Sequence, residues 1–283
     1  MRNKIPTRWG LLPLAVASLT ACTQPLTEGQ AAALQTTTGQ IEASLSLPAT
    51  LQQDAHGAAF VTGNLCEYLA GNRAYGLGAL PPALDIGPTA NSRLSLARAL
   101  KRYLNDLIDA SRGDSLTQLQ TSRDAFVVQA AALTGSPATV EPVLAATLVL
   151  LGRIGEAQRQ DAIRGIMDGV ADDISTLPVV LAGDEMAVLA DVEAQIGRYE
   201  QAARCVLNVQ RTDAAASEIF LAYDAEIRDL RAQAALIKAA PALVRSLRKI
   251  HIDIVDEKVS FVDGLSQLAD VLEDINTITS PEN

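Results

Sequence analysis

The segment "PALVRSLRKIHIDIVDEKVSFVDGLSQLADVLEDINTI", Pro241–Ile278, carries the most regular pattern in the chain. Its stripe positions follow one another at spacings of four and three residues, and they are Leu243, Leu247, Ile250, Ile254, Lys258, Phe261, Leu265, Leu268, Leu272 and Ile275. A sustained seven-residue repeat places these side chains on one helical face and favours coiled-coil-like packing. An extra spacing of four falls at Lys258, the only charged member. We expect one helix over 241–278, about 57 Å long.

Most of the remaining chain shows the same helical spacing, and no segment alternates apolar and polar residues as a strand does. The sequence predicts helices over 29–47, 48–71, 91–111, 115–134, 139–177, 186–206 and 213–237. Pro48, Pro178 and Pro241 mark expected helix ends or kinks. Long helices on short turns form elongated, largely antiparallel bundles. The predicted fold is therefore all-α, an elongated and mostly antiparallel helical bundle with coiled-coil-like long helices.

The stretch from Asn72 to Ser92 is rich in glycine and proline, and no regular element fits there. Irregular loops of this length are uncommon in compact domains and are often functional. We expect a loop over 72–92, and if the protein were an enzyme, Arg73, Tyr75 and Asp85 would be the reactive side chains of this loop.

The first residues are typical of an export signal. Arg2, Lys4 and Arg8 form a basic start, and Gly10–Ala21 is a short run of apolar or small residues, too short to span a bilayer. The end of this run, Leu19-Thr20-Ala21-Cys22, resembles the lipobox of bacterial lipoproteins. The resemblance implies that the Cys22 thiol receives a diacylglyceryl group and that a signal peptidase cuts before Cys22. The alternative is an ordinary signal peptide that leaves Cys22 as a free thiol.

With this resemblance, the chain divides into a signal peptide (1–21), a lipidated tether (22–29) and a helical bundle domain (30–283). Several acyl chains on Cys22 hold a protein stably at a membrane. Thr23 rather than Asp follows Cys22, which in Gram-negative lipoproteins favours the outer membrane, with the bundle facing the periplasm. Removal of the three basic signal residues leaves 20 basic against 33 acidic residues, a net charge of -13. Such acidity argues against nucleic acid as a partner.

Composition supports a folded domain without membrane-spanning helices. Hydrophobic residues make up 48% of the chain, which is enough for a core, whereas aromatic residues make up only 4%. The longest apolar run after Cys22 is Val143–Ile154, which is too short for a transmembrane helix.

Cys66 and Cys205 are the remaining cysteines. Two cysteines in an exported protein are often paired, which favours a disulfide between them. The alternative is a pair of buried reduced thiols that pack as small hydrophobic side chains.

Motifs for catalysis, metals and cofactors are missing from the sequence. His56 and His251 belong to no metal-binding pattern, and the chain has no CxxC motif, no P-loop and no GxSxG nucleophile elbow. "GLGAL" at Gly76–Leu80 lacks the spacing of a dinucleotide fingerprint. We therefore expect no catalytic residue, no metal site and no cofactor, and an enzyme is the least favoured class.

These observations favour a membrane-anchored envelope lipoprotein that acts as a structural or protein-interaction module. Its expected partners are the membrane, through the lipid, and either another envelope protein or a second copy. The candidate interaction seam is Leu243, Leu247, Ile250, Ile254, Phe261, Leu265, Leu268 and Leu272, with a plain core role as the alternative. A second hypothesis is a carrier or sensor of an apolar ligand held between helices.

Overall fold

The computed structural model describes residues 28–72, 80–86, 88–135, 156–209, 213–259, 263–264 and 267. All regular secondary structure in these ranges is helical. The elements are α1 (Glu28–Leu69), α2 (Pro88–Ser111), α3 (Leu116–Thr134), α4 (Glu156–Asp168), α5 (Ala171–Gly183), α6 (Glu185–Val209), α7 (Asp213–Leu236), the 3₁₀ turn η3 (Ile237–Ala239) and α8 (Ala240–Val255).

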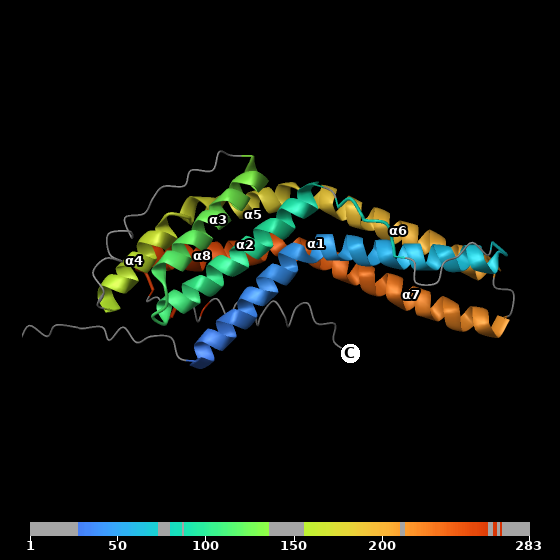
Figure 1. The fold of residues 1–283 in the computed structure, drawn as a ribbon, viewed down its shortest axis with the longest axis horizontal. Coiled ribbons are helices and arrows are strands. Elements are labelled where there is room, and N and C mark those ends of the chain that lie inside the picture. Colours follow the sequence, from blue (N-terminus) through green and yellow to red (C-terminus); the bar gives the residue numbers. More distant parts are fainter. Residues whose placement is uncertain are drawn as a thin grey trace, which may run out of the picture.

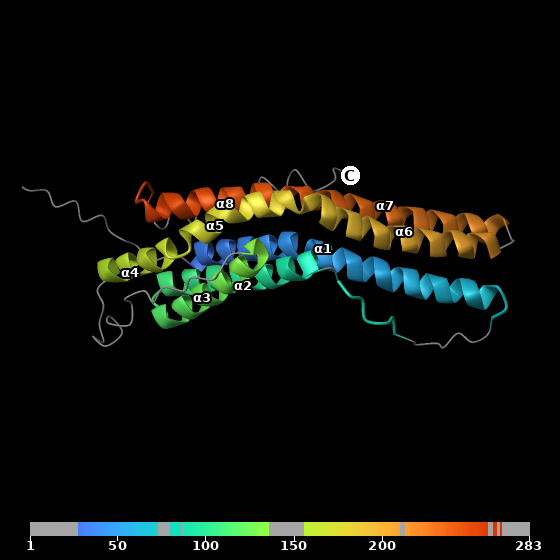
Figure 2. The same cartoon turned by 90° about the horizontal axis from the view of Figure 1, so that it is seen from above.

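Three lines of helix run along nearly the whole length of the molecule (Figures 1 and 2). They are α1, then α5 followed by α6, and finally α7 followed by η3 and α8. Helices α2, α3 and α4 lie beside these lines at the end where α1 begins. The pairs α5/α8 and α6/α7 are antiparallel, whereas the second half of α1 runs in the same direction as α6. The predicted elongated, mostly antiparallel all-α bundle is therefore confirmed.

The buried apolar side chains form two clusters, one at each end of the molecule. We call the two parts the base (28–46, 88–135, 156–183 and 240–259) and the arm (47–72, 185–209 and 213–239). The base core joins the first half of α1 to α2, α3, α4, α5 and α8. The arm core joins the second half of α1 to α6, α7 and η3. Burial of one large apolar side chain stabilises a fold by about 1.5–3 kcal/mol. Each of the two clusters therefore stabilises the part of the molecule that contains it.

Helix α6 shows how the sequence pattern becomes the arm core. Its buried face includes Val188, Val192, Ile196 and Tyr199, each at most 1% exposed. These positions follow the three-and-four spacing that puts side chains on one helix face. Met186, the first residue of the helix expected over 186–206, is 75% exposed, so the buried face starts at Val188.

The predicted helix over 241–278 is wrong in its extent, because α8 ends at Val255. Glu257 has a φ of 57°. The Glu257 N–H donates to the Ile254 carbonyl and the Lys258 N–H donates to the Asp253 carbonyl, which is the hydrogen-bond pattern of a Schellman motif. The extra spacing of four in the sequence therefore falls where this helix ends.

Two of the expected proline breaks are also wrong. Helix α1 continues through Pro48, so the helices expected over 29–47 and 48–71 are one element of 42 residues. Figure 1 shows that α1 bends near its middle, as a proline inside a helix predicts. Helix α5 likewise continues through the buried Pro178, and the interruption falls at Gly169-Val170 instead.

The loop expected over 72–92 is shorter in the structure, because α2 begins at Pro88. Proline suits the first turn of a helix, where its missing N–H has no partner to lose. Residues 80–86 are irregular, and the His56 Nε2 donates to the Pro82 carbonyl over 3.0 Å, which ties this segment to α1. The chain turns after α2 at Gly113 and after α3 at Gly135, and both glycines have positive φ. Ser115 caps α3 by accepting a hydrogen bond from the Gln118 N–H.

Candidate functional site

A disulfide joins α1 to α6 near the free end of the arm. Cys66 and Cys205 are bonded, with a Cα–Cα distance of 5.8 Å and a sequence separation of 139. This is the pairing that the sequence favoured over two free thiols. The bond lies one turn before the end of each helix, so it holds together two segments that would otherwise fray.

Exposed large apolar side chains gather at the same end of the arm. Six of the ten in the described residues lie there, and they are Val61, Leu65, Tyr68, Leu69, Phe220 and Leu221. The first four occupy positions i, i+4, i+7 and i+8 of α1, which is one helix face. Phe220 and Leu221, on α7, are 52% and 65% exposed. We call these six residues the tip patch.

A groove of about 520 Å³ opens between α6 and α7 beside Phe220. Its apolar lining is Ala203, Leu207, Phe220, Tyr223 and Ile227. Its polar lining is Glu200, Arg204, Asn208, Asp224 and Arg231. Half of the lining residues are therefore polar, which is a more polar lining than most small-molecule pockets have.

Two arginines share one carboxylate at the rim of this groove. The Glu200 carboxylate accepts from Arg204 on the same helix at 2.5 Å and from Arg231 on α7 at 2.8 Å. These hydrogen bonds hold the pKa of Glu200 below its usual range. Glu200 therefore stays ionised and links α6 to α7 across the groove.

Behind the groove, the Tyr199 hydroxyl donates to the Glu226 carboxylate. Burial, followed by this hydrogen bond, raises the pKa of Tyr199. The Tyr199 ring also meets the Tyr223 ring edge-on, at 5.9 Å between ring centroids. Tyr223, which lines the groove, is therefore fixed by the arm core, so one wall of the groove is rigid.

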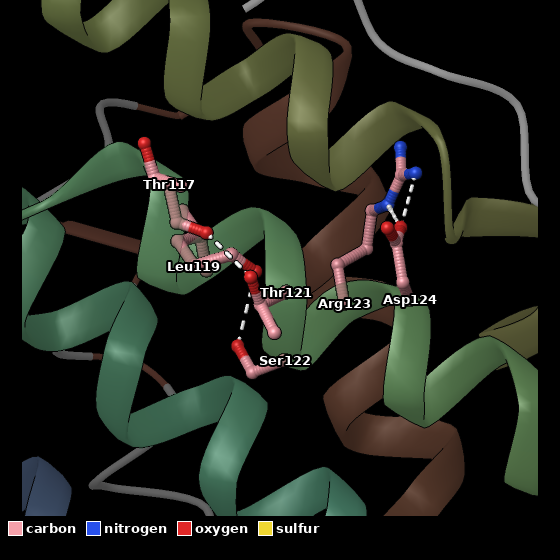
Figure 3. A network of polar contacts seen from close by, with 6 residues as sticks. All are labelled: Thr117, Leu119, Thr121, Ser122, Arg123 and Asp124. Atoms are coloured by element: carbon pink, nitrogen blue, oxygen red, sulfur yellow. Dashed lines mark hydrogen bonds and ion pairs between the residues drawn. The ribbon is translucent and has the colours of Figure 1, made fainter. Parts of the chain in front are cut away.

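A second, shallower groove of about 570 Å³ lies between α2 and α3 in the base. Arg98 and Arg102 line it beside Ala99 and Val128. The adjacent Arg123 donates to the Asp124 carboxylate, the only acid of the lining, as Figure 3 shows. The lining therefore carries positive charge on an acidic protein. Only one exposed large apolar side chain, Val128, lines it, so it ranks behind the arm tip as a candidate.

Four of the eight residues of the predicted interaction seam are buried in the base core. Leu243, Leu247, Ile250 and Ile254 are at most 4% exposed and belong to the base core, so they offer no exposed surface. The reason is that α5 packs antiparallel against the same face of α8. Phe261, Leu265, Leu268 and Leu272 lie outside the residues whose side chains the structure describes.

The other residues singled out from the sequence do not converge on one site. Cys22, Arg73 and Tyr75 lie outside the described residues, and Asp85 is exposed on the segment beside α1. His251 is buried in the base, far along the chain from His56 in the arm. The tip patch was missed because a helical stripe on α1 looks like core until its packing partners are known.

Neither a metal centre nor a membrane span is found in the described part of the chain. No three His, Cys, Asp or Glu side chains converge there as metal ligands. None of the helices described has an apolar stretch sufficient for crossing a bilayer.

No protein-family model, curated protein or solved structure matches the chain. The class that the fold defines is therefore the elongated all-α helical bundle with two cores.

Proposed function

We propose that this protein is a lipid-anchored envelope protein that presents the tip of its arm to a protein partner. The observation that carries the proposal is the tip patch, where six exposed apolar side chains gather at one end of an otherwise acidic molecule. Large exposed apolar side chains that share a helix face, as Val61, Leu65, Tyr68 and Leu69 do on α1, are typical of a surface that binds another protein.

The shape supports this arrangement. Helix α1 starts at Glu28, six residues after Cys22, and ends beside the disulfide at the tip. A straight helix of 42 residues is about 63 Å long. An anchor at Cys22 would therefore hold the base near the membrane, and the arm would reach away from it. The disulfide fits an oxidising compartment such as the periplasm.

Site-specific photocrosslinking in intact cells of the source organism tests this proposal. A photoreactive residue at Leu221 is expected to give a discrete crosslinked product. The matched control is Thr117, an exposed polar residue of α3 in the base, which is expected to give none. The proposal fails if Leu221 and Thr117 give the same pattern.

A second candidate function is the carriage of an apolar ligand in the groove between α6 and α7. The groove favours it, because Phe220, Tyr223 and Leu207 supply an apolar lining large enough for a small molecule. Native mass spectrometry of the purified protein tests this candidate. A bound mass that is lost in Leu207→Trp, which narrows the groove from a partly exposed position, supports a carrier, and a ligand-free spectrum contradicts it.

A further inference from the structure

Each of the three helix lines that pass from the base to the arm has an irregularity at the boundary between the two cores. In α1, Leu45 belongs to the base core and Leu47 packs on the arm core. In the second line, Leu181 belongs to the base and Val188 to the arm. In the third, Ile237 belongs to the arm and Ala240 to the base.

Each crossing has its own physical weakness. Pro48 has no N–H to donate to the carbonyl of Ser44, so α1 lacks a helical hydrogen bond there. The hydroxyls of Ser46 and Thr50 bond to the carbonyls of Ala43 and Ser46, a pattern that bends helices.

The other two crossings are breaks between separate helices. Asp184 alone separates α5 from α6, with a φ of -97° and a ψ of 0°. The third crossing is η3, a single 3₁₀ turn between α7 and α8. A short 3₁₀ stretch inside a longer helical line often marks a hinge.

One buried side chain holds the middle crossing to the base. Arg93 of α2 donates from Nη2 to the Leu181 carbonyl at 2.7 Å and from Nε to the Asp184 carboxylate at 3.3 Å, and Nη2 also pairs with that carboxylate. The Arg93 side chain is 1% exposed and the Asp184 side chain is 20% exposed. The planar guanidinium therefore binds both the last turn of α5 and Asp184, the residue between α5 and α6. We call this contact the Arg93–Asp184 clasp.

Within the ranges that the structure describes, the outer side of this crossing carries exposed apolar side chains and no ion pair of this kind. Val179 of α5 and Met186 of α6, seven residues apart on either side of Asp184, are each 75% exposed. Bending the α5–α6 line therefore meets resistance mainly from the Arg93 clasp and from the two other crossings.

We infer that the boundary between the cores is a hinge on which the arm swings as a rigid body, and that the Arg93–Asp184 clasp limits its range. Hinges are a few residues at element ends that absorb backbone changes, while the packed units on either side keep their shape. The inference is independent of the lipid anchor and of the partner at the tip.

Distance distributions between spin labels test the hinge. Labels are attached through genetically encoded non-cysteine residues in the full chain, which leaves Cys66 and Cys205 bonded. The base-to-arm pair is Thr117 with Gln201, the arm pair is Gln53 with Gln201, and the base pair is Thr117 with Arg248, all exposed positions. In the unmodified protein, the base-to-arm distribution is expected to be wider than both within-unit distributions. Equal widths would overturn the hinge.

The double variant Arg93→Met/Asp184→Ala tests the clasp, since it removes both charges together and leaves no buried ion unpaired. Its base-to-arm distribution is expected to be at least twice as wide as that of the unmodified protein, with the within-unit pairs unchanged. The matched control, Lys101→Met/Glu42→Ala, removes an ion pair between α1 and α2 inside the base. If both variants widen the base-to-arm distribution equally, or neither does, the clasp is overturned. Arg93→Lys, which keeps the charge but loses the planar fork, gives the same test should the double variant not fold.

Discussion

The Tyr103 hydroxyl and the His251 Nε2 lie 3.1 Å apart in the base core, although 148 residues separate them in sequence. Both side chains are buried, and Phe126 stacks on Tyr103 at 5.8 Å between ring centroids. Among the described residues, the His251 Nδ1 has no hydrogen-bond partner. This contact joins α2 to α8 and makes the base core sensitive to protonation of one imidazole.

We predict that stability falls as the pH is lowered through the range in which His251 titrates in the unfolded chain. Burial lowers the pKa of His251 from 6.5 to about 3. Above pH 6.5 the imidazole is neutral in both states and contributes no pH dependence. Below pH 6.5 the unfolded chain binds a proton at His251 that the folded chain does not bind. The free energy of unfolding therefore falls by about 1.4 kcal/mol per pH unit.

The measurement is the free energy of unfolding by urea at pH 7 and pH 5 for the unmodified protein and for His251→Gln. Because other groups titrate in both proteins, the His251 contribution is the difference between their pH dependences, about 2 kcal/mol. Identical pH dependences would show that His251 is not buried in its neutral form.

We predict that Cys66→Ser/Cys205→Ser folds but is less stable. The bond closes a loop with a sequence separation of 139 residues, for which the chain-entropy model gives a loss of about 5 kcal/mol, at the upper end of the usual range. Urea unfolding of the variant, and of the native protein with and without reductant, measures this loss. A count of two free thiols in the denatured, unreduced native protein would contradict the bond.

We predict that removing Asp184 alone destabilises the protein more than removing both partners of the clasp. Asp184→Ala leaves the buried Arg93 charge unpaired and is expected to cost about 3–5 kcal/mol. Arg93→Met/Asp184→Ala is expected to be more stable than Asp184→Ala, because no buried charge remains. Denaturant unfolding of the single and double variants gives the coupling, and a double variant no more stable than Asp184→Ala would contradict the buried ion pair.

We predict that Gly264→Ala is destabilising because of close packing behind α8. A Cβ atom at Gly264 would lie 2.4 Å from Cγ1 of the buried Ile254. Overpacking of this kind costs about 1–3 kcal/mol. Ile254→Ala is expected to remove most of that extra cost in a double-mutant cycle. Additive losses would show that residue 264 does not pack on α8.

The sequence predicted the fold class because long apolar stripes at helical spacing leave few other solutions, as Val192, Ile196 and Tyr199 illustrate. It did not predict the end of α8, because a Schellman turn at Glu257 uses a residue type that is uncommon at positive φ. It also did not predict the passage of α1 through Pro48, where packing on both cores outweighs one lost hydrogen bond.

The candidate site was less predictable than the fold. Leu247 and Leu65 both belong to helical apolar stripes, but only packing decides that the first is 2% exposed and the second 38% exposed. The pairing of Cys66 with Cys205 was accessible from composition and context alone, since these two cysteines are the only ones after Cys22.

We propose that the base end of the chain is held at a membrane, and this attachment depends on Cys22. The mass of the N-terminal peptide of the protein extracted from membranes tests it. We predict a peptide that begins at Cys22 and carries a diacylglyceryl group on the thiol, and we predict that Cys22→Ser abolishes both the cleavage and the lipid. A peptide that begins elsewhere, or a free thiol at Cys22, would contradict the claim.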